Sequence, residues 1–146
     1  MSTESDRIST VGALAFNGNK VLLVKHGEAA HHLTGVYGLP GGRLALGEGL
    51  LDAAAREFQE ETGLVPEKST MKKIPTIYEA EILRKGGEIL KTSWNLFLIS
   101  DYSGELKGSD ETSPEWVKID SMSELNLLPN TEEVVSEGLK INERQI

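Results

Sequence analysis

The chain has 146 residues, of which 38% are hydrophobic and 26% are charged, and this composition predicts one globular domain with a buried core. Its formal net charge of -8 disfavours a nucleic-acid backbone or an anionic membrane as a partner, and it has no cysteine for disulfides, zinc-thiolate sites or thiol catalysis. It shows no signal-peptide pattern and no apolar run near the roughly 20 residues of a membrane span, so we expect a cytoplasmic protein.

Strands and turns dominate the elements expected in chain order. Residues 1–9 are polar and predict a disordered tail. Apolar and β-branched runs bounded by turn residues predict strands at 10–16, 21–24, 36–39, 72–83, 89–100 and 115–119. Asn17-Gly18 and Lys85-Gly86-Gly87 are typical hairpin turns, the first after strand 10–16 and the second after strand 72–83. Polar loops are expected at 27–35 and 104–113.

One helix is expected between the third and fourth strands. At about 100° per residue, five apolar side chains gather into one arc, namely Leu50, Leu51, Ala54, Ala55 and Phe58. Gly47 or Gly49 is the expected N-cap, and Gly63 suits the left-handed position that ends a helix.

A second helix is expected near the end of the chain, over residues 131–141, with Asn130 or Thr131 as its N-cap. Residues 122–127 predict a short helical turn before it. Strands around one helix, followed by another helix, predict an α/β or α+β fold.

Three carboxylates within five residues share a further sector of the first helix, namely Glu57, Glu60 and Glu61. Glu57 and Glu61 are one turn apart, and Glu61 projects inside the edge of the apolar arc, where an unpaired charge is costly to bury. Such a cluster repels itself and favours a divalent cation. A solvated acidic face with a capping glycine is the alternative, but it does not account for the offsets of Gly42, Glu48 and Arg56.

Residues 42–64 read GRLALGEGLLDAAAREFQEETGL and have the spacing G-x5-E-x7-R-E-U-x-E-E-x-G-U, in which U is apolar. At every fixed position this stretch resembles the signature of the Nudix hydrolases, which include MutT-like enzymes and ADP-sugar pyrophosphatases. The resemblance implies the Nudix fold, a mixed β-sheet sandwiched between helices, as a single domain over residues 1–146. The order of the predicted strands and helices agrees with that fold over nearly the whole chain. The strong match to the motif is limited to residues 35–64.

Hydrolysis of a phosphoanhydride needs charge neutralisation on the phosphates, an oriented water and a stabilised leaving group. Mg²⁺ supplies much of this and is the expected cofactor, with Mn²⁺ as a substitute. Because Glu57 and Glu61 share a helix face, we expect both to be metal ligands, and Glu60 to bind a second ion directly or through water. The resemblance adds the backbone carbonyl before the first glycine of the motif, which belongs here to Gly41.

Further residues complete the predicted site. Arg56 is expected to hold a carboxylate in place beside the metal, and a free surface arginine is the alternative. Glu48 is expected to bind the metal or to orient a ligand, and otherwise to favour the start of the helix. In Nudix enzymes an acidic residue from a later loop is an extra ligand or the general base, and Glu111 is favoured over Asp110 because its side chain reaches further. The predicted catalytic residues are Arg56, Glu57, Glu60, Glu61 and Glu111.

Other polar and aromatic residues have two interpretations each. Lys25, His26 and Arg43 lie near the expected phosphate path, but such residues are more often solvated surface groups. His31 and His32 lie in a polar loop, where solvation is favoured. Stacking on a nucleotide base is the alternative to core packing for four aromatic residues, namely Tyr37, Tyr78, Trp94 and Phe97.

The predicted function is Mg²⁺-dependent hydrolysis of a nucleoside diphosphate linked to another moiety, with water attacking phosphorus and a nucleoside monophosphate released. Nucleoside triphosphates and ADP-sugars such as ADP-ribose both stay open, because residues 80–82 hold neither the ADP-ribose nor the dinucleotide marker. The expected partner is a small nucleotide, with no nucleic acid or membrane, and a homodimer is compatible with this. The alternative is a non-catalytic Nudix-fold nucleotide-binding or regulatory module, which should lack one or more of the motif's carboxylates, and this chain has them all.

Overall fold

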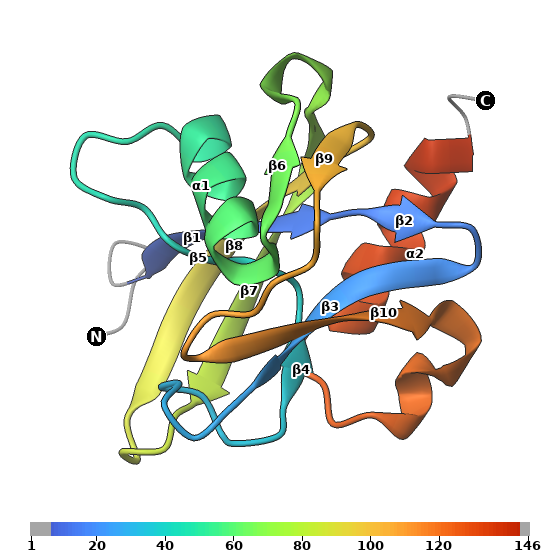
Figure 1. The fold of residues 1–146 in the computed structure, drawn as a ribbon. Helices are drawn as coiled ribbons and strands as arrows, with labels where there is room; N and C mark the ends of the chain where they lie inside the picture. Colours follow the sequence, from blue (N-terminus) through green and yellow to red (C-terminus); the bar gives the residue numbers. More distant parts are fainter. Residues whose placement is uncertain (1–6, 144–146) are drawn as a thin grey trace.

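A four-stranded mixed sheet in the order β5-β1-β8-β7 forms the centre of the fold (Figure 1). β1 (Ile8–Leu14) and β8 (Ile89–Leu98) run parallel in its middle. β5 (Gly41–Arg43) pairs antiparallel with β1, and β7 (Lys72–Leu83) pairs antiparallel with β8. The computed structural model of the chain describes residues 7–143.

A second sheet has the order β10-β3-β2, with β4 paired to the other edge of β3. Its strands are β2 (Phe16–Asn17), β3 (Lys20–His26), β4 (Tyr37–Gly38) and β10 (Thr112–Lys118). β6 (Leu64–Pro66) and β9 (Tyr102–Gly104) form a separate antiparallel pair. Two short 3-10 helices are η2 (Lys68–Thr70) and η3 (Ile119–Glu124).

The first helix, α1, spans Leu50–Thr62 and lies between two glycines, as predicted. Gly49 is the N-cap residue and makes no side-chain cap hydrogen bond. Gly63 adopts φ 79°, and its N–H donates to the Gln59 carbonyl at 2.9 Å. A left-handed residue at this position satisfies a helix carbonyl that would otherwise lack a partner.

The second helix, α2 (Thr131–Glu143), covers the face of the larger sheet opposite to α1 (Figure 1). Successive side chains of a strand point to opposite faces, and the two core clusters follow this alternation. Val11 of β1 shares one cluster with Phe58 of α1, and Leu96 of β8 shares the other with Val134 of α2. The mixed sheet sandwiched between helices is therefore confirmed. Within residues 7–143, no helix is long and apolar enough to cross a membrane.

The structure differs from the sequence-based expectations at several boundaries. Ile8 and Ser9 were expected in the terminal tail but form the start of β1, while residues 1–6 lie outside the described part of the chain. The last predicted strand begins earlier, because Thr112 already pairs with His26 of β3. The Gly-rich turn includes a strand, β5, which the pattern did not indicate because Gly-Gly-Arg has no apolar alternation.

Replacing Phe58 by alanine should remove a fully buried ring from the contact between α1 and the sheet. We expect a loss of about 3–5 kcal/mol in the free energy of unfolding, because both the burial of the ring and its packing are lost. Urea unfolding followed by circular dichroism measures it. Leu46→Ala is the matched control, since Leu46 is fully exposed at 107%, and its effect should stay within about 0.5 kcal/mol. Equal effects of the two substitutions would contradict this account of the core.

Candidate active site

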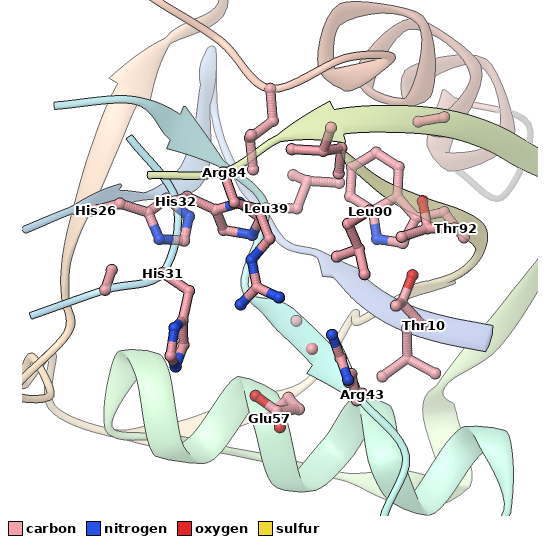
Figure 2. A pocket seen from close by; sticks show the side chains of 18 of the residues that line it. Thr10, His26, His31, His32, Leu39, Arg43, Glu57, Arg84, Leu90 and Thr92 are labelled. Carbon is pink, nitrogen blue, oxygen red and sulfur yellow. The ribbon is translucent and has the colours of Figure 1, made fainter. Parts of the chain in front are cut away.

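A cleft of about 680 Å³ opens beside α1, and Glu57 of this helix lines it (Figure 2). Its walls come from segments far apart in the chain: β1, the loop after β3, β5, α1, the hairpin between β7 and β8, and the loop before β10. Glu57, Glu61 and Glu111 all line it, together with Gly41 and Gly42. The cleft therefore collects the two glycines of the Gly-rich turn, two glutamates of the motif and the distal loop glutamate.

Glu61 is the most deeply placed of these carboxylates. Its Oε1 accepts a hydrogen bond from the backbone N–H of Gly41 at 2.7 Å. Burial raises the pKa of Glu61 to about 8, the charges of Glu57 and Glu111 push this pKa in the same direction, and the Gly41 hydrogen bond opposes them. Burial also raises the pKa of Glu57, against the effect of the neighbouring Arg56. In the absence of a cation, folding therefore disfavours the ionised carboxylates of Glu57 and Glu61.

Arg56 links four acceptors at the outer side of this cluster. Its Nε donates to Glu48 at 2.8 Å, its Nη1 donates to Glu57 at 2.9 Å and to Glu60 at 2.8 Å, and its Nη2 donates to the Arg43 carbonyl at 3.1 Å. This guanidinium holds the pKa of Glu48 down at about 2, and its own pKa is raised. Arg56 is therefore not a free surface arginine, and it restrains the carboxylate of Glu57.

Glu48 and Glu60 were predicted as metal ligands, but neither lines the cleft. Glu48 bonds within the loop before the helix, where it accepts from the Ala45 N–H at 2.8 Å, and it also accepts from Arg56. The side chain of Glu60 is 51% exposed and bonds to Arg56. Both glutamates accept hydrogen bonds from Arg56, whereas Glu57 and Glu61 line the cleft.

The residues around Glu57 and Glu61 fit a hard divalent cation. Within residues 7–143, no three acidic, histidine or cysteine side chains converge closely enough to form a ready-made metal site. The donor set is nevertheless oxygen-rich and short of positive charge, and Mg²⁺ needs only one or two carboxylates because it keeps several waters and binds phosphates. Gly42 leaves room beside Glu57, since a Cβ there would lie 2.7–2.9 Å from the atoms of its carboxylate.

The weaker candidates from the sequence divide into two groups. His26, His31, His32, Arg43 and Trp94 line the cleft, whereas Lys25 does not. His32 is half-buried and packs edge-on against the ring of His26 with centroids 4.8 Å apart, so the solvated loop expected there is wrong for His32. All four aromatic residues pack in or against the hydrophobic clusters, and Trp94 alone of them also lines the cleft, the others being Tyr37, Tyr78 and Phe97.

Arg84 and Glu88 also line the cleft, although their spacing in the sequence indicates no role. They flank the predicted Gly86-Gly87 turn at the tip of the β7–β8 hairpin. A turn signal shows where the chain reverses, but it does not show which neighbouring segment the tip contacts. The backbone of Lys85 bonds to that of His31, and this contact between distant loops brings the tip to the cleft.

Comparisons with known proteins agree with this geometry. The family model described as NUDIX domain matches residues 6–137. The chain is 31% identical over 108 residues to the ADP-ribose pyrophosphatase of Methanocaldococcus jannaschii, which covers 73% of this chain and 59% of that protein, less than two thirds of its length. It is 24% identical over 127 residues to the 8-oxo-dGTP diphosphatase of Escherichia coli, covering 86% and 91% of the two chains. Its fold resembles the crystal structure of a MutT NUDIX hydrolase from Burkholderia pseudomallei, with a TM-score of 0.73, 23% identity and coverage of 90% and 97%.

The metal-free protein should lose stability through Glu61 as the pH rises. The pKa of this carboxyl is about 8 when folded, against an ordinary value of 4.5, so the folded chain binds more protons between these two values. Its destabilising effect is therefore absent below about pH 4.5 and grows up to about pH 8. We expect the stability advantage of Glu61→Gln over the parent to widen by on the order of 3 kcal/mol between pH 5 and 8.

Urea unfolding in EDTA at several pH values measures this difference. The carboxyl of Glu48, whose pKa of about 2 has the opposite sign of shift, titrates below this pH range and does not mask the effect. A gap between the two proteins that stays constant with pH would contradict the burial of Glu61.

Proposed function

The chain belongs to the Nudix hydrolase family, and from this premise we propose that it hydrolyses the phosphoanhydride of a nucleoside diphosphate linked to another moiety. Water attacks phosphorus, and a nucleoside monophosphate is released. Mg²⁺ is the proposed cofactor, Mn²⁺ its substitute, and a small nucleotide in the cytoplasm is the proposed partner. ADP-sugars and nucleoside triphosphates are the two substrate classes, in line with the names of the archaeal pyrophosphatase and the bacterial diphosphatase that the chain resembles.

The observation that carries this proposal is the convergence of Glu57, Glu61 and Glu111 on one cleft of about 680 Å³. Burial raises the pKa of Glu61, and the like charges of Glu57 and Glu111 on the same cleft raise it further. A structural role would not retain such an arrangement, because unpaired charges are costly to bury. A site that binds a cation together with an anionic phosphate accounts for it.

The cleft residues have separate proposed roles in binding the cation, orienting its ligands and contacting the phosphates. Glu57 and Glu61 would hold the cation, which when bound supplies charge neutralisation on the phosphates. Arg56 keeps the carboxylate of Glu57 oriented through the 2.9 Å hydrogen bond from its Nη1. Arg43 lines the same cleft and can pair with a phosphate oxygen of the substrate (Figure 2).

Glu111 is the proposed general base. It lines the cleft and contributes to the raised pKa of Glu61, whereas Asp110 does not line it. The carboxylate of Glu111 would take the proton of the attacking water. Glu48 and Glu60, the other carboxylates considered for this task, are turned toward Arg56.

A non-catalytic nucleotide-binding module is the second candidate. Such a module has no use for a base or for a set of cation ligands, and the loss of one carboxylate would not matter to it. Here each carboxylate of the motif is present, and the distal glutamate faces the same cleft. These features favour hydrolysis over binding alone.

Glu57→Gln and Glu61→Gln should each lower kcat by at least about 100-fold, because a lost ligand removes charge stabilisation in the transition state. The measurement is release of phosphate or nucleoside monophosphate from a panel of ADP-ribose, 8-oxo-dGTP, NADH and dinucleotide polyphosphates with Mg²⁺. Mg²⁺ should also raise the Tm of the parent protein and not that of the double variant, since the cation binds the folded cluster.

Glu132→Gln is the control, because Glu132 is an exposed carboxylate on α2, away from the cleft. It should keep both the parent kcat and the Mg²⁺-dependent rise in Tm. Full activity of Glu57→Gln or Glu61→Gln at saturating Mg²⁺ would refute the assignment of the cation ligands.

Glu111→Gln should reduce kcat more than it raises KM and should flatten the acid limb of the pH profile, because the amide cannot accept a proton. Asp110→Asn, one residue away and outside the cleft, should behave as the parent does. Steady-state kinetics between pH 5 and 9 tests both. Parent-like kinetics of Glu111→Gln would move the role of base to another carboxylate.

A further inference from the structure

We propose that Ser109 and Lys85 are positioning residues that hold Glu111, the proposed general base, at the cleft. Neither Ser109 nor Lys85 lines the cleft, and each acts through the backbone around Glu111. The proposal rests on the proposed function, since Glu111 is a base only if the chain hydrolyses a phosphoanhydride.

Glu111 lies at the end of a segment that does not hold its own shape. Residues 105–111 are exposed and form neither helix nor strand, and such loops are usually mobile. A general base must lie within hydrogen-bond reach of the water that it deprotonates. A displacement of about 1 Å can cost up to about 100-fold in rate. Contacts from outside the side chain therefore have to fix the position of Glu111.

Ser109 fixes the N–H side of Glu111. Its Oγ accepts from the backbone N–H of Glu111 at 3.2 Å and from that of Thr112 at 3.0 Å, and it lies 3.0 Å from Thr112 Oγ1. The N–H of Ser109 donates to the Thr112 carbonyl at 2.9 Å and closes a tight turn. Gly108 permits this turn, since a Cβ there would lie 2.8 Å from the Thr112 carbonyl oxygen.

Lys85 fixes the carbonyl side of Glu111 through the loop after β3. The N–H of Gly27, in that loop, donates to the Glu111 carbonyl at 2.8 Å. Lys85 Nζ in turn donates to the carbonyls of Gly27 at 3.2 Å and Glu28 at 2.7 Å, and the Lys85 N–H donates to the His31 carbonyl at 3.3 Å. The tip of the β7–β8 hairpin thus holds the loop, and the loop holds Glu111.

The backbone of Glu111 is therefore bonded on both sides, and its side chain lines the cleft, whereas Asp110, one residue earlier, does not line it. A purely structural role of the same contacts would stabilise the loop whatever side chain stands at position 111. A positioning role requires the carboxylate of Glu111. The effect of removing Ser109 or Lys85 should then depend on whether that carboxylate is present, which a double-mutant cycle measures.

Steady-state kinetics with Mg²⁺ on ADP-ribose and 8-oxo-dGTP provide this cycle. We expect Ser109→Ala to lower kcat about tenfold and Lys85→Met about threefold, because Lys85 acts through Gly27, with KM changed by less than about twofold. In the Glu111→Gln background each loss should shrink to less than about twofold. Ser109→Thr keeps the hydroxyl and should keep the parent kcat.

Ser113→Ala and Lys72→Met are the matched controls, because both residues are exposed, lie in β10 and β7 and do not line the cleft. Both should keep the parent kcat. The positioning role is refuted for Ser109 or Lys85 if its variant keeps the parent kcat, or if its loss persists in full in the Glu111→Gln background.

Amide hydrogen exchange of the metal-free protein, followed by NMR, separates this proposal from the proposed function. Ser109→Ala should speed exchange of the Glu111 and Thr112 amides at least about tenfold, and Lys85→Met that of the Gly27 amide, with the buried Val11 unchanged. Unchanged exchange at these amides would overturn the proposal. A parent protein that shows these effects but hydrolyses neither substrate would refute the proposed hydrolysis and leave the held position of Glu111 standing.

Discussion

The close contact between α1 and β5 is the constraint on which the rest of the site depends. Gly41 donates its backbone N–H to Glu61 at 2.7 Å, and Gly42 lies so near Glu57 that a Cβ would fall within 2.9 Å of the carboxylate. At Gly41, a side chain would overlap the carbonyl of Val11 in β1. Only glycine permits this approach at both positions, and the approach places two helix carboxylates at the floor of the cleft.

A second feature follows from this contact, because it leaves the acidic side of α1 divided between two environments. Glu57 and Glu61 face the cleft, where burial raises the pKa of both. Glu48 and Glu60 lie outside it and pair with Arg56, whose Nη1 also bonds to Glu57. Arg56 therefore connects the two carboxylates outside the cleft to Glu57 inside it, and its single positive charge only partly balances the three carboxylates that it contacts.

The sheets supply the other walls of the cleft and so decide what can bind beside the carboxylates. β8 runs through the middle of the larger sheet and presents Leu90, Thr92 and Trp94 to one end. The hairpin that joins β7 to β8 bends its tip toward the loop after β3 and adds Arg84 and Glu88 at the other end. The same pair of strands thus forms an apolar end and a polar end, and a nucleotide derivative with two unlike groups fits this asymmetry.

The sequence by itself determined α1, its limiting glycines, its buried arc and the carboxylates on it, because a helix is defined by local spacing and its faces follow from 3.6 residues per turn. The strands whose apolar and polar residues alternate clearly could be predicted for the same reason. The three-residue strands β5, β6 and β9 are too short to show such a pattern. Only the tertiary structure decided which carboxylates face the cleft. Glu111 reaches Glu61 because Thr112 of β10 pairs with His26 of β3. Arg84 and Glu88 enter the cleft through a contact between two loops that are distant in the chain, and local sequence holds no signal for such pairings.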